Sequence, residues 1–371
     1  MPITSSSVNT VHSLPRGGLA WGLALAIIVS YFGFTPPASG QERTDKVEYW
    51  LRGKDSVKTI RTGMVMEESP AKVVLRQMNG ERLEIPAEDV IDIDYEGAPS
   101  ATILAKSAER NRQWDQAQQQ YEKALKELKP NQRSLELSLR FRLADLAFQQ
   151  TQAGESSKVD GALSAFRQFL KDYTSCRQTL PAWERLGRLL VSQGARVDEA
   201  VAGLRGVKEK VSDPPGFAAR CDLIAIRLVL LEAQNPRLSQ SISARERFGE
   251  ALAWIERLQE TVQGPVLQEI RRLRPTALAG AGKRAEALQA IDSLIAAAED
   301  DRGRAQLLLD RGDVKRILAQ PAEARWDYLR VELLYSQERD LQTKALERLA
   351  EVFTELGDTA RARDYRERLK K

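Results

Sequence analysis

The side chains that most often perform acid–base, nucleophilic or metal-binding chemistry are scarce in this sequence of 371 residues. The chain has one histidine, His12, and two cysteines, Cys176 and Cys221, which lie far apart. A Ser-His-Asp or Cys-His catalytic site needs a histidine beside the nucleophile, and zinc sites need clusters of cysteine and histidine. Because we expect the segment with His12 to be removed, we predict no catalytic residue, no metal and no cofactor.

Charged side chains are the remaining candidates for binding chemistry. They make up 29% of the chain and nearly balance, at a formal net charge of +4, which does not favour a nucleic-acid partner. One basic run has two interpretations. It either grips an acidic partner or forms a solvated helix face, which is the commoner case; its members are Arg271, Arg272, Arg274, Lys283 and Arg284.

Residues 1–40 are typical of a targeting segment. Arg16 precedes an apolar run from Leu19 to Phe34, and Ala38-Ser39-Gly40 offers the small residues of a signal-peptidase site. The run is shorter than the roughly 20 residues that span a bilayer. We therefore predict export with cleavage before Gln41, into the periplasm or the extracellular space; membrane contact is expected only if the leader stays as an anchor. Export would permit a disulfide between the two cysteines, and this stays open.

Residues 45–97 have an apolar pattern with a period of two, which indicates strands. The pair Asn79-Gly80 predicts a type I′ hairpin turn. The strands are expected to form a small barrel or a curled sheet, since a flat sheet would leave long edges. The segment resembles small SH3-like or Sm-like barrels in the order of its strands, and we expect it to cap the helical array that follows. The five predicted strands are residues 47–51, 60–65, 72–77, 82–85 and 90–95.

From Ala98 onward the period changes to that of amphipathic helices, and helix pairs recur at near-regular intervals. The third copy has Trp183, Leu186, Gly187 and Leu190 at the spacing W-x-x-L-G-x-x-L. We expect Trp183 to be a packing residue rather than a ligand-stacking one. The other copies carry small, apolar and aromatic residues at equivalent positions, among them Leu104, Ala105, Ala108, Ala117, Tyr121, Ala124, Ala162, Phe166, Gly312, Ala324, Tyr328, Leu349 and Phe353.

This spacing resembles that of the tetratricopeptide repeat (TPR) family, whose members are binding scaffolds. The resemblance implies a mainly α fold, in which an α-α superhelix of about seven helix pairs over residues 98–371 follows the small β domain. Pro275 stands where the family usually has glycine or alanine. We expect a kink or a helix start there, because a proline inside a helix costs about 3 kcal/mol.

The resemblance also implies that the first helix of each pair lines a concave groove for a peptide or partner protein. No asparagine falls at these positions, so the clamp for a peptide's terminal carboxylate is not predicted. We expect a mixed polar and charged surface, and we expect reversal of Arg272 and Arg316 to weaken binding without changing thermal stability. The groove positions are Thr102, Lys106, Glu109, Glu184, Arg188, Arg272, Thr276, Asp313, Arg316, Glu347 and Glu351.

Three functions are compatible with this pattern. The favoured one is a non-enzymatic scaffold for protein–protein interaction in the cell envelope. The second is an enzyme or accessory subunit of cell-wall chemistry in which the array holds the substrate; the lack of histidine and of paired-carboxylate motifs argues against it. The third is carbohydrate binding by the β segment, which would need Tyr49, Trp50 and Tyr95 exposed on one face.

Overall fold

A computed structural model of the chain describes residues 44–52, 57–211, 216–235 and 244–369. The expected leader, residues 1–40, lies outside these ranges. Within them, no helix is long and apolar enough to cross a membrane.

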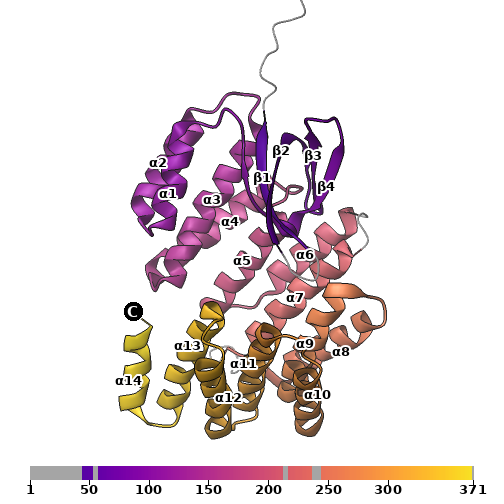
Figure 1. Ribbon diagram of the computed structural model, residues 1–371, viewed down its shortest axis with the longest axis vertical. Coiled ribbons are helices and arrows are strands. Elements are labelled where there is room, and N and C mark those ends of the chain that lie inside the picture. Colours follow the sequence, from indigo (N-terminus) through magenta and orange to yellow (C-terminus); the bar gives the residue numbers. More distant parts are fainter. Residues whose placement is uncertain (1–43, 53–56, 212–215, 236–243, 370–371) are drawn as a thin grey trace, which may run out of the picture. The chain divides into compact units, whose positions relative to one another are not determined.

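An antiparallel sheet of five strands opens the described chain (Figure 1). The strands are β1 (Asp45–Leu51), β2 (Val57–Glu68), β3 (Lys72–Gln77), β4 (Arg82–Pro86) and β5 (Val90–Asp94), with the short helix η1 (Ala87–Asp89) before β5. Their order in the sheet is β4-β3-β2-β1-β5. The five predicted strands are confirmed, with boundaries close to those expected.

The sheet does not close into a barrel, so the barrel, one of the two expected forms, is wrong. Strands β4 and β5 are its two edges and do not pair with each other within the described residues. Strand β4 ends at Pro86, which has no backbone N–H to extend a ladder. The outer edge of β5 is engaged by charged side chains from the helices, as described below, which is one of the ways in which proteins protect a sheet edge.

The interior of the sheet follows the period of two that the sequence shows. Val47, Leu75, Ile85 and Ile93 are buried on one face. The hairpin between β3 and β4 also forms, but its turn is not type I′, which needs two residues with positive φ. Only Gly80 has one, at +83°, and its N–H donates to the carbonyl of Gln77 at 2.9 Å. This arrangement is that of a three-residue loop ending in a left-handed glycine.

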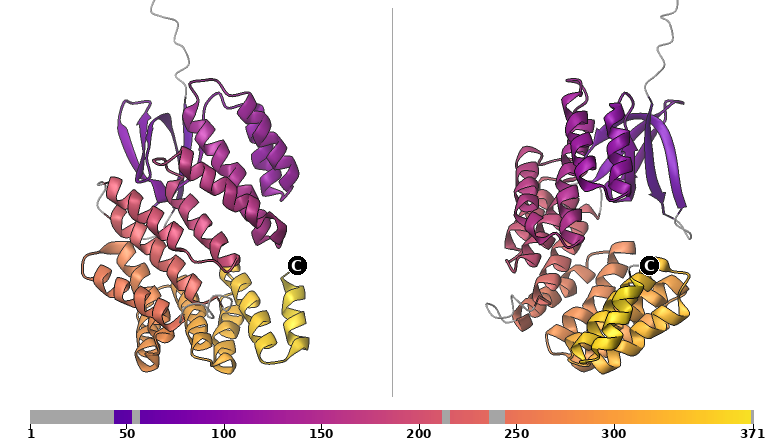
Figure 2. Two further views of the ribbon diagram at one scale, coloured as in Figure 1. Left: turned by 180° about the vertical axis from the view of Figure 1, so that it is seen from behind. Right: turned by 90° about the vertical axis from the view of Figure 1, so that its left-hand side faces the viewer.

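Fourteen α-helices follow in the described ranges and form seven antiparallel-neighbour pairs in a TPR-like array (Figure 1); Figure 2 shows the same succession from two other sides. The odd-numbered member of each pair is called the A helix below, and the even-numbered member the B helix. The A helices are α1 (Ser100–Arg110), α3 (Arg133–Gln152), α5 (Thr179–Ser192), α7 (Phe217–Ala233), α9 (Gly264–Gly280), α11 (Asp301–Ile317) and α13 (Arg339–Glu355). The B helices are α2 (Trp114–Lys126), α4 (Val159–Asp172), α6 (Asp198–Lys210), α8 (Ala244–Gln259), α10 (Arg284–Ala296), α12 (Pro321–Leu334) and α14 (Thr359–Arg368).

The repeat positions pack as their sizes require. Ala117, Tyr121 and Ala124 are fully buried in the first pair. A β-carbon on Gly312 would lie 2.3 Å from the ring of the buried Tyr328, so only glycine lets these two helices approach this closely. Leu104 departs from the expectation, since it is 56% exposed. Ala105 and Ala108 face the core of the pair instead, because they occupy the helix face toward α2.

Helix α9 is continuous through Pro275, which is buried in its interior. The expectation that a helix begins at this proline is therefore wrong. The ring removes one backbone hydrogen bond, but Ile270, Ala277 and Leu278 on either side are fully buried. Burial of this apolar surface offsets the lost hydrogen bond.

The sheet contacts more of the array than its first repeat. Ala71 belongs to the hydrophobic core that includes residues of α7, and Tyr95 belongs to the cores of both the sheet and the first helix pair. Ion pairs join Glu68 of β2 to Arg177, just before α5, at 3.4 Å, and Glu88 of η1 to Arg220 of α7. The sheet therefore does more than cap the end of the array.

Candidate functional site

All the expected groove positions lie on A helices, but most of their charges are paired within the protein. We call the series of contacts between consecutive A helices the A-helix ladder. It runs from α1 to α3 through Glu109 and Arg142, from α3 to α5 through Asp145 and Arg185, from α7 to α9 through Arg227 and Glu269, from α9 to α11 through Arg272 and Asp310, and from α11 to α13 through Arg316 and Glu351.

The last step of the ladder is the most heavily paired. Arg316 bonds Glu351 at 2.7 Å and also contacts Glu355, while Arg348 returns across the same gap to Asp313 at 2.9 Å. Asp313 also accepts a hydrogen bond from the hydroxyl of Tyr328 at 2.7 Å. Each of the two helices, α11 and α13, thus contributes an arginine that pairs with a carboxylate of the other. These ion pairs fix one helix against the other.

Asp310 is the least satisfied member of the ladder. Its Oδ2 atom lies 3.1 Å from Nε of Arg272 but makes no hydrogen bond, and only its Oδ1 accepts one, from Gln306 at 2.9 Å. Burial raises the pKa of Asp310 to about 6, and the positive charge of Arg272 only partly opposes this. The ionised form of Asp310 is therefore destabilised in the folded protein.

The ladder is interrupted between α5 and α7, where no ion pair joins the described parts of the two helices. A β-carbon on Gly187 would lie 2.5 Å from Leu228, so the two helices are held by close apolar packing. Trp183 is half-buried and packs against the cores on both sides of this joint. The expectation that it is a packing residue fits this position.

Thr102, which is buried, Lys106 and Glu184 form no contact of the ladder, and three further expected groove residues also stay outside it. Among the residues described, Arg188 pairs only with Glu184 of its own helix, at 2.8 Å, and nearly half of its side chain is exposed. Thr276 is half-buried, and Glu347 is exposed. These three are separated along the array, so the structure does not bring them together into one site.

A cleft of about 950 Å³ opens where the sheet meets the first A helices. We call it the junction cleft. Residues of strands β1 and β5 line one side, and residues of α1 and α3 line the other. The residues used below that line it are Lys46, Asp92, Asp94, Ile103, Lys106, Glu109, Arg110, Arg112, Arg142 and Gln149.

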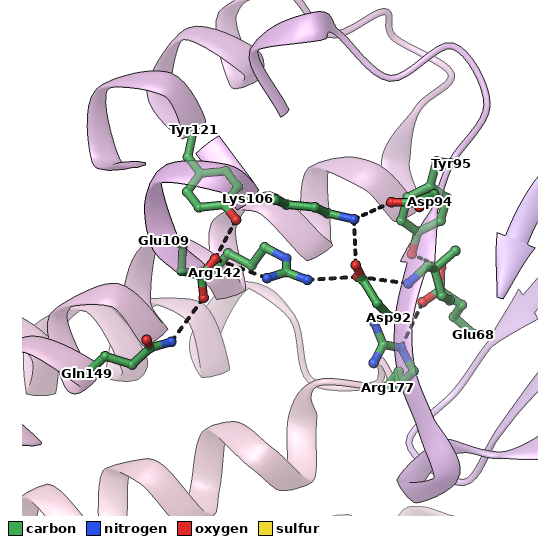
Figure 3. Close-up of polar contacts among 11 residues, drawn as sticks. Glu68, Asp92, Asp94, Tyr95, Lys106, Glu109, Tyr121, Arg142, Gln149 and Arg177 are labelled. Atoms are coloured by element: carbon green, nitrogen blue, oxygen red, sulfur yellow. Dashed lines mark hydrogen bonds and ion pairs between the residues drawn. The ribbon is translucent and has the colours of Figure 1, made fainter. Parts of the chain in front are cut away.

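Asp92 of β5 is the centre of a charge network that crosses this cleft (Figure 3). It accepts bonds from Lys106 of α1 and Arg142 of α3, both at 2.7 Å, and Lys106 also reaches Asp94 at 2.5 Å. Burial would raise the pKa of Asp92, but the charges of Arg142 and Lys106 outweigh it and hold that pKa below its ordinary value. Asp92 also accepts the backbone N–H of Ile93 at 2.9 Å, which occupies a donor of the strand edge.

Glu109 extends this network deeper into the array. It accepts hydrogen bonds from the hydroxyl of Tyr121 at 2.6 Å, from Arg142 at 3.1 Å and from Gln149 at 3.0 Å. Burial and the neighbouring carboxylate raise the pKa of Tyr121 against the effect of Arg142, so this phenol stays protonated as a donor. Lys106 and Glu109, both expected in the groove, are therefore structural members of the junction.

A second, smaller network of polar side chains joins β2 to Tyr95 and Arg177. The hydroxyl of Tyr95 donates to Glu68 at 2.6 Å, and Arg177 lies 3.4 Å from the other oxygen of that carboxylate. Burial and the charge of Glu68 raise the pKa of Tyr95 well above its ordinary value. The hydroxyl of Tyr95 is held by Glu68, and the side chain of Tyr49 is buried. Only Trp50 of the three aromatic residues is exposed, so they form no sugar-stacking face.

At the rim of the junction cleft lie several exposed side chains that have no ion partner in the described part of the chain. Ile103 of α1 is 68% exposed and lines the cleft. Lys46, Arg110 and Arg112 also line it, and none of the three makes an ion pair with another described residue. The rim therefore presents one exposed apolar side chain and three cations. They lie beside the charge network of Asp92, in which the opposite charges are paired with one another.

The cysteines do not form a disulfide. Cys176 and Cys221 are both free and buried. Burial raises the pKa of each thiol, and for Cys221 it raises the pKa to about 12. Neither thiol is therefore poised to act as a nucleophile.

Comparison with known proteins found only solved structures that are similar to this chain. No family model and no curated protein matches the sequence. The chain is similar to a solved set of TPR-like repeats from a putative kinesin light chain of Podosopora anserina, at 18% identity, over 52% of this chain and 93% of that one, with a TM-score of 0.33. It is also similar to a tetratricopeptide repeat protein from Parabacteroides merdae, at 16% identity, over 67% and 96%, with a TM-score of 0.32.

A third similar structure is that of a Rap protein in complex with competence and sporulation factor. It is 17% identical, over 73% of each chain, with a TM-score of 0.39. The sequences differ too much, and the superpositions are too loose, for a function or a partner to be transferred from any of these proteins.

Proposed function

We propose that this chain is a non-enzymatic scaffold of the cell envelope that binds a segment of a partner protein at the rim of the junction cleft. The observation that carries the proposal is the position of three side chains beside one cleft of about 950 Å³: exposed Ile103, and Arg110 and Arg112, which have no ion partner among the described residues. An exposed aliphatic side chain next to cations suits a partner segment that combines apolar and acidic residues.

The A-helix ladder has a supporting role in this proposal. Arg272, Asp313 and Arg316 are held by other side chains of the protein, so a partner would have to break those ion pairs to use them. Breaking a partly buried pair leaves an uncompensated charge and is costly. The ladder therefore sets the spacing of the helices, and the partner binds where charges are still available.

Action outside the cytoplasm is the second part of the proposal. It rests on Arg16, the apolar run Leu19–Phe34 and the small residues before Gln41. The two buried thiols are compatible with an oxidising compartment, because burial protects a thiol from exchange.

Site-specific photo-crosslinking in cells tests the binding site. A photoreactive amino acid replaces Ile103 in one variant and Leu333 of α12 in the other. The two positions are matched, since their side chains are 68% and 67% exposed, but only Ile103 lines the junction cleft. We expect a discrete cross-linked partner from position 103 and none from position 333.

Two further measurements complete this test. Replacing Arg110 and Arg112 by glutamine should weaken the cross-link at position 103, and rising salt should weaken it further, because the contact is partly electrostatic. Equal cross-linking from both positions, or a cross-link unaffected by loss of both arginines, would refute the site.

A further inference from the structure

The basic run in the fifth helix pair is divided by the structure between two faces of α9. Arg272 joins the A-helix ladder through Asp310 and Glu269, at 3.1 and 3.2 Å. Arg271 and Arg274 instead line a separate cleft of about 530 Å³ formed with the end of α8 and with α10. Figure 1 shows these three helices together at one side of the array. The run is therefore more than a single solvated face.

Neither guanidinium in this cleft is neutralised by a residue that the structure describes. Arg271 and Arg274 make no ion pair or hydrogen bond with another described residue, whereas most arginines on the A helices do. The cleft contains one carboxylate, Glu286, which lies 3.9 Å from the ammonium group of Lys283. Two cations thus face an open cleft with little local negative charge to compensate them.

The rest of the lining suits a peptide rather than an isolated ion. Gln259 and Gln289 supply amide groups, and Ala290 and Leu294 supply apolar surface. Residues three apart on a helix carry their side chains roughly 5–6 Å apart at Cβ. Alternate side chains of an extended peptide are about 6.5 Å apart and point to the same side, so two acidic residues at alternate positions match the two arginines.

We propose that the cleft between α8, α9 and α10 is a second binding site, which takes an extended acidic segment with carboxylates at alternate positions. Each guanidinium pairs with one carboxylate, since its planar donors match a carboxylate oxygen pair. Ala290 and Leu294 contact the peptide between the charges. The inference rests on the proposed function in one respect only, namely that the ligand is part of a protein.

Binding of a fluorescent, terminally blocked peptide of alternating aspartate and alanine to the purified protein tests this site. Fluorescence anisotropy gives the dissociation constant. The double variant Arg271→Gln, Arg274→Gln should weaken binding by about tenfold or more. The matched control is Arg133→Gln with Arg363→Gln, which removes two exposed arginines that also lack an ion partner among the described residues; it should change binding by less than about twofold, since only long-range charge is lost.

Four results would overturn the inference. They are no measurable binding of the aspartate peptide, equal binding of a peptide with asparagine in place of aspartate, equal losses in the two double variants, and equally tight competition by inorganic phosphate. The last result would identify a site for free anions. Arg271→Lys with Arg274→Lys keeps the charge and should retain part of the binding even if the glutamine variant folds poorly. The purified components make the outcome independent of cross-linking at Ile103.

Discussion

Replacing Arg142 by methionine should separate the sheet from the helices without disturbing either core. Among the described residues, Arg142 alone bonds both Asp92 of β5, at 2.7 Å, and Glu109 of α1, at 3.1 Å. Methionine keeps most of the apolar stem but removes the charge. The two carboxylates would then share fewer cations, although Lys106 would still pair with Asp92.

The size of the effect follows from the exposure of the groups. Removing one partner from a fully buried pair costs about 3–5 kcal/mol. Here the side chains of Arg142, Asp92 and Glu109 keep 22%, 25% and 15% of their surface exposed, and other donors remain. We therefore expect a loss of about 2 kcal/mol, which is between the buried and the surface values.

Arg167 provides a matched control. It makes two bonds to Glu199, at 2.9 and 2.7 Å, but both side chains are more than 40% exposed. Exposed pairs contribute about 0–1 kcal/mol, so Arg167→Met should have little effect. The two variants remove the same chemical group and a similar number of bonds, and differ mainly in burial.

Hydrogen exchange measured by mass spectrometry is the suitable assay, because a long repeat array need not unfold in one step. In Arg142→Met, peptides from β5 and α1 should lose protection by about thirtyfold, which corresponds to 2 kcal/mol. In Arg167→Met the same peptides should be unchanged. Equal losses in both variants would refute the argument from burial.

The same variant also changes the response to acid. The folded-state pKa of Asp92 is lowered, so the ionised carboxylate stabilises the fold above its unfolded-state pKa. That stabilisation is lost as the pH falls through the folded-state value. Without Arg142 the folded-state pKa rises, so separation of the sheet should begin at a higher pH than in the wild-type protein.

Three further predictions concern other parts of the chain. The folded-state pKa of Asp310 is raised to about 6, so the free energy of unfolding should increase as the pH falls through 6 toward the ordinary carboxyl pKa. The increase should be at most about 3 kcal/mol. Denaturation measured over a series of pH values should show the increase for the wild-type protein and not for Asp310→Asn. Replacing Arg272 and Arg316 together by glutamate should lower the Tm, contrary to the sequence-based expectation. Each new glutamate would face a carboxylate, Asp310 or Glu351, to which the arginine is now paired. An unchanged Tm would disprove a structural role for the ladder. N-terminal sequencing of the expressed protein should begin at Gln41, and a product that begins at Met1 would replace secretion with anchoring.

Local pattern was enough to predict most of the backbone. Alternation around Val47 and Tyr49 located β1, and the spacing of Ala117, Tyr121 and Ala124 located the first B helix, because both signals arise from which side chains must be buried. The continuity of α9 through Pro275 was not predictable in the same way. It depends on packing against neighbouring helices, which a local propensity does not contain.

The candidate site was harder to predict because its partners are distant in sequence. Asp92 and Arg142 are 50 positions apart, and neither belongs to a motif. The only sequence signal was the pair of acidic residues Asp92 and Asp94 in a strand that ends beside a helix. Lys106 and Glu109 were placed on the correct helix, but long charged side chains can turn toward a neighbour as easily as toward solvent, and sequence spacing does not decide between these directions.

The A-helix ladder also distinguishes one repeat from another during folding. Similar repeats that are adjacent in a chain can dock in the wrong order, which is a characteristic failure of repeat proteins. Here α3 presents Asp145 to the next A helix, whereas α7 presents Arg227 and α9 presents Arg272. Docking α3 directly against α9 would bring Asp145 toward Glu269, so like charges disfavour this misassembly. The differences between repeats in these charged residues make the repeat pattern weaker in the sequence. The same differences help to specify a single order in which the repeats dock.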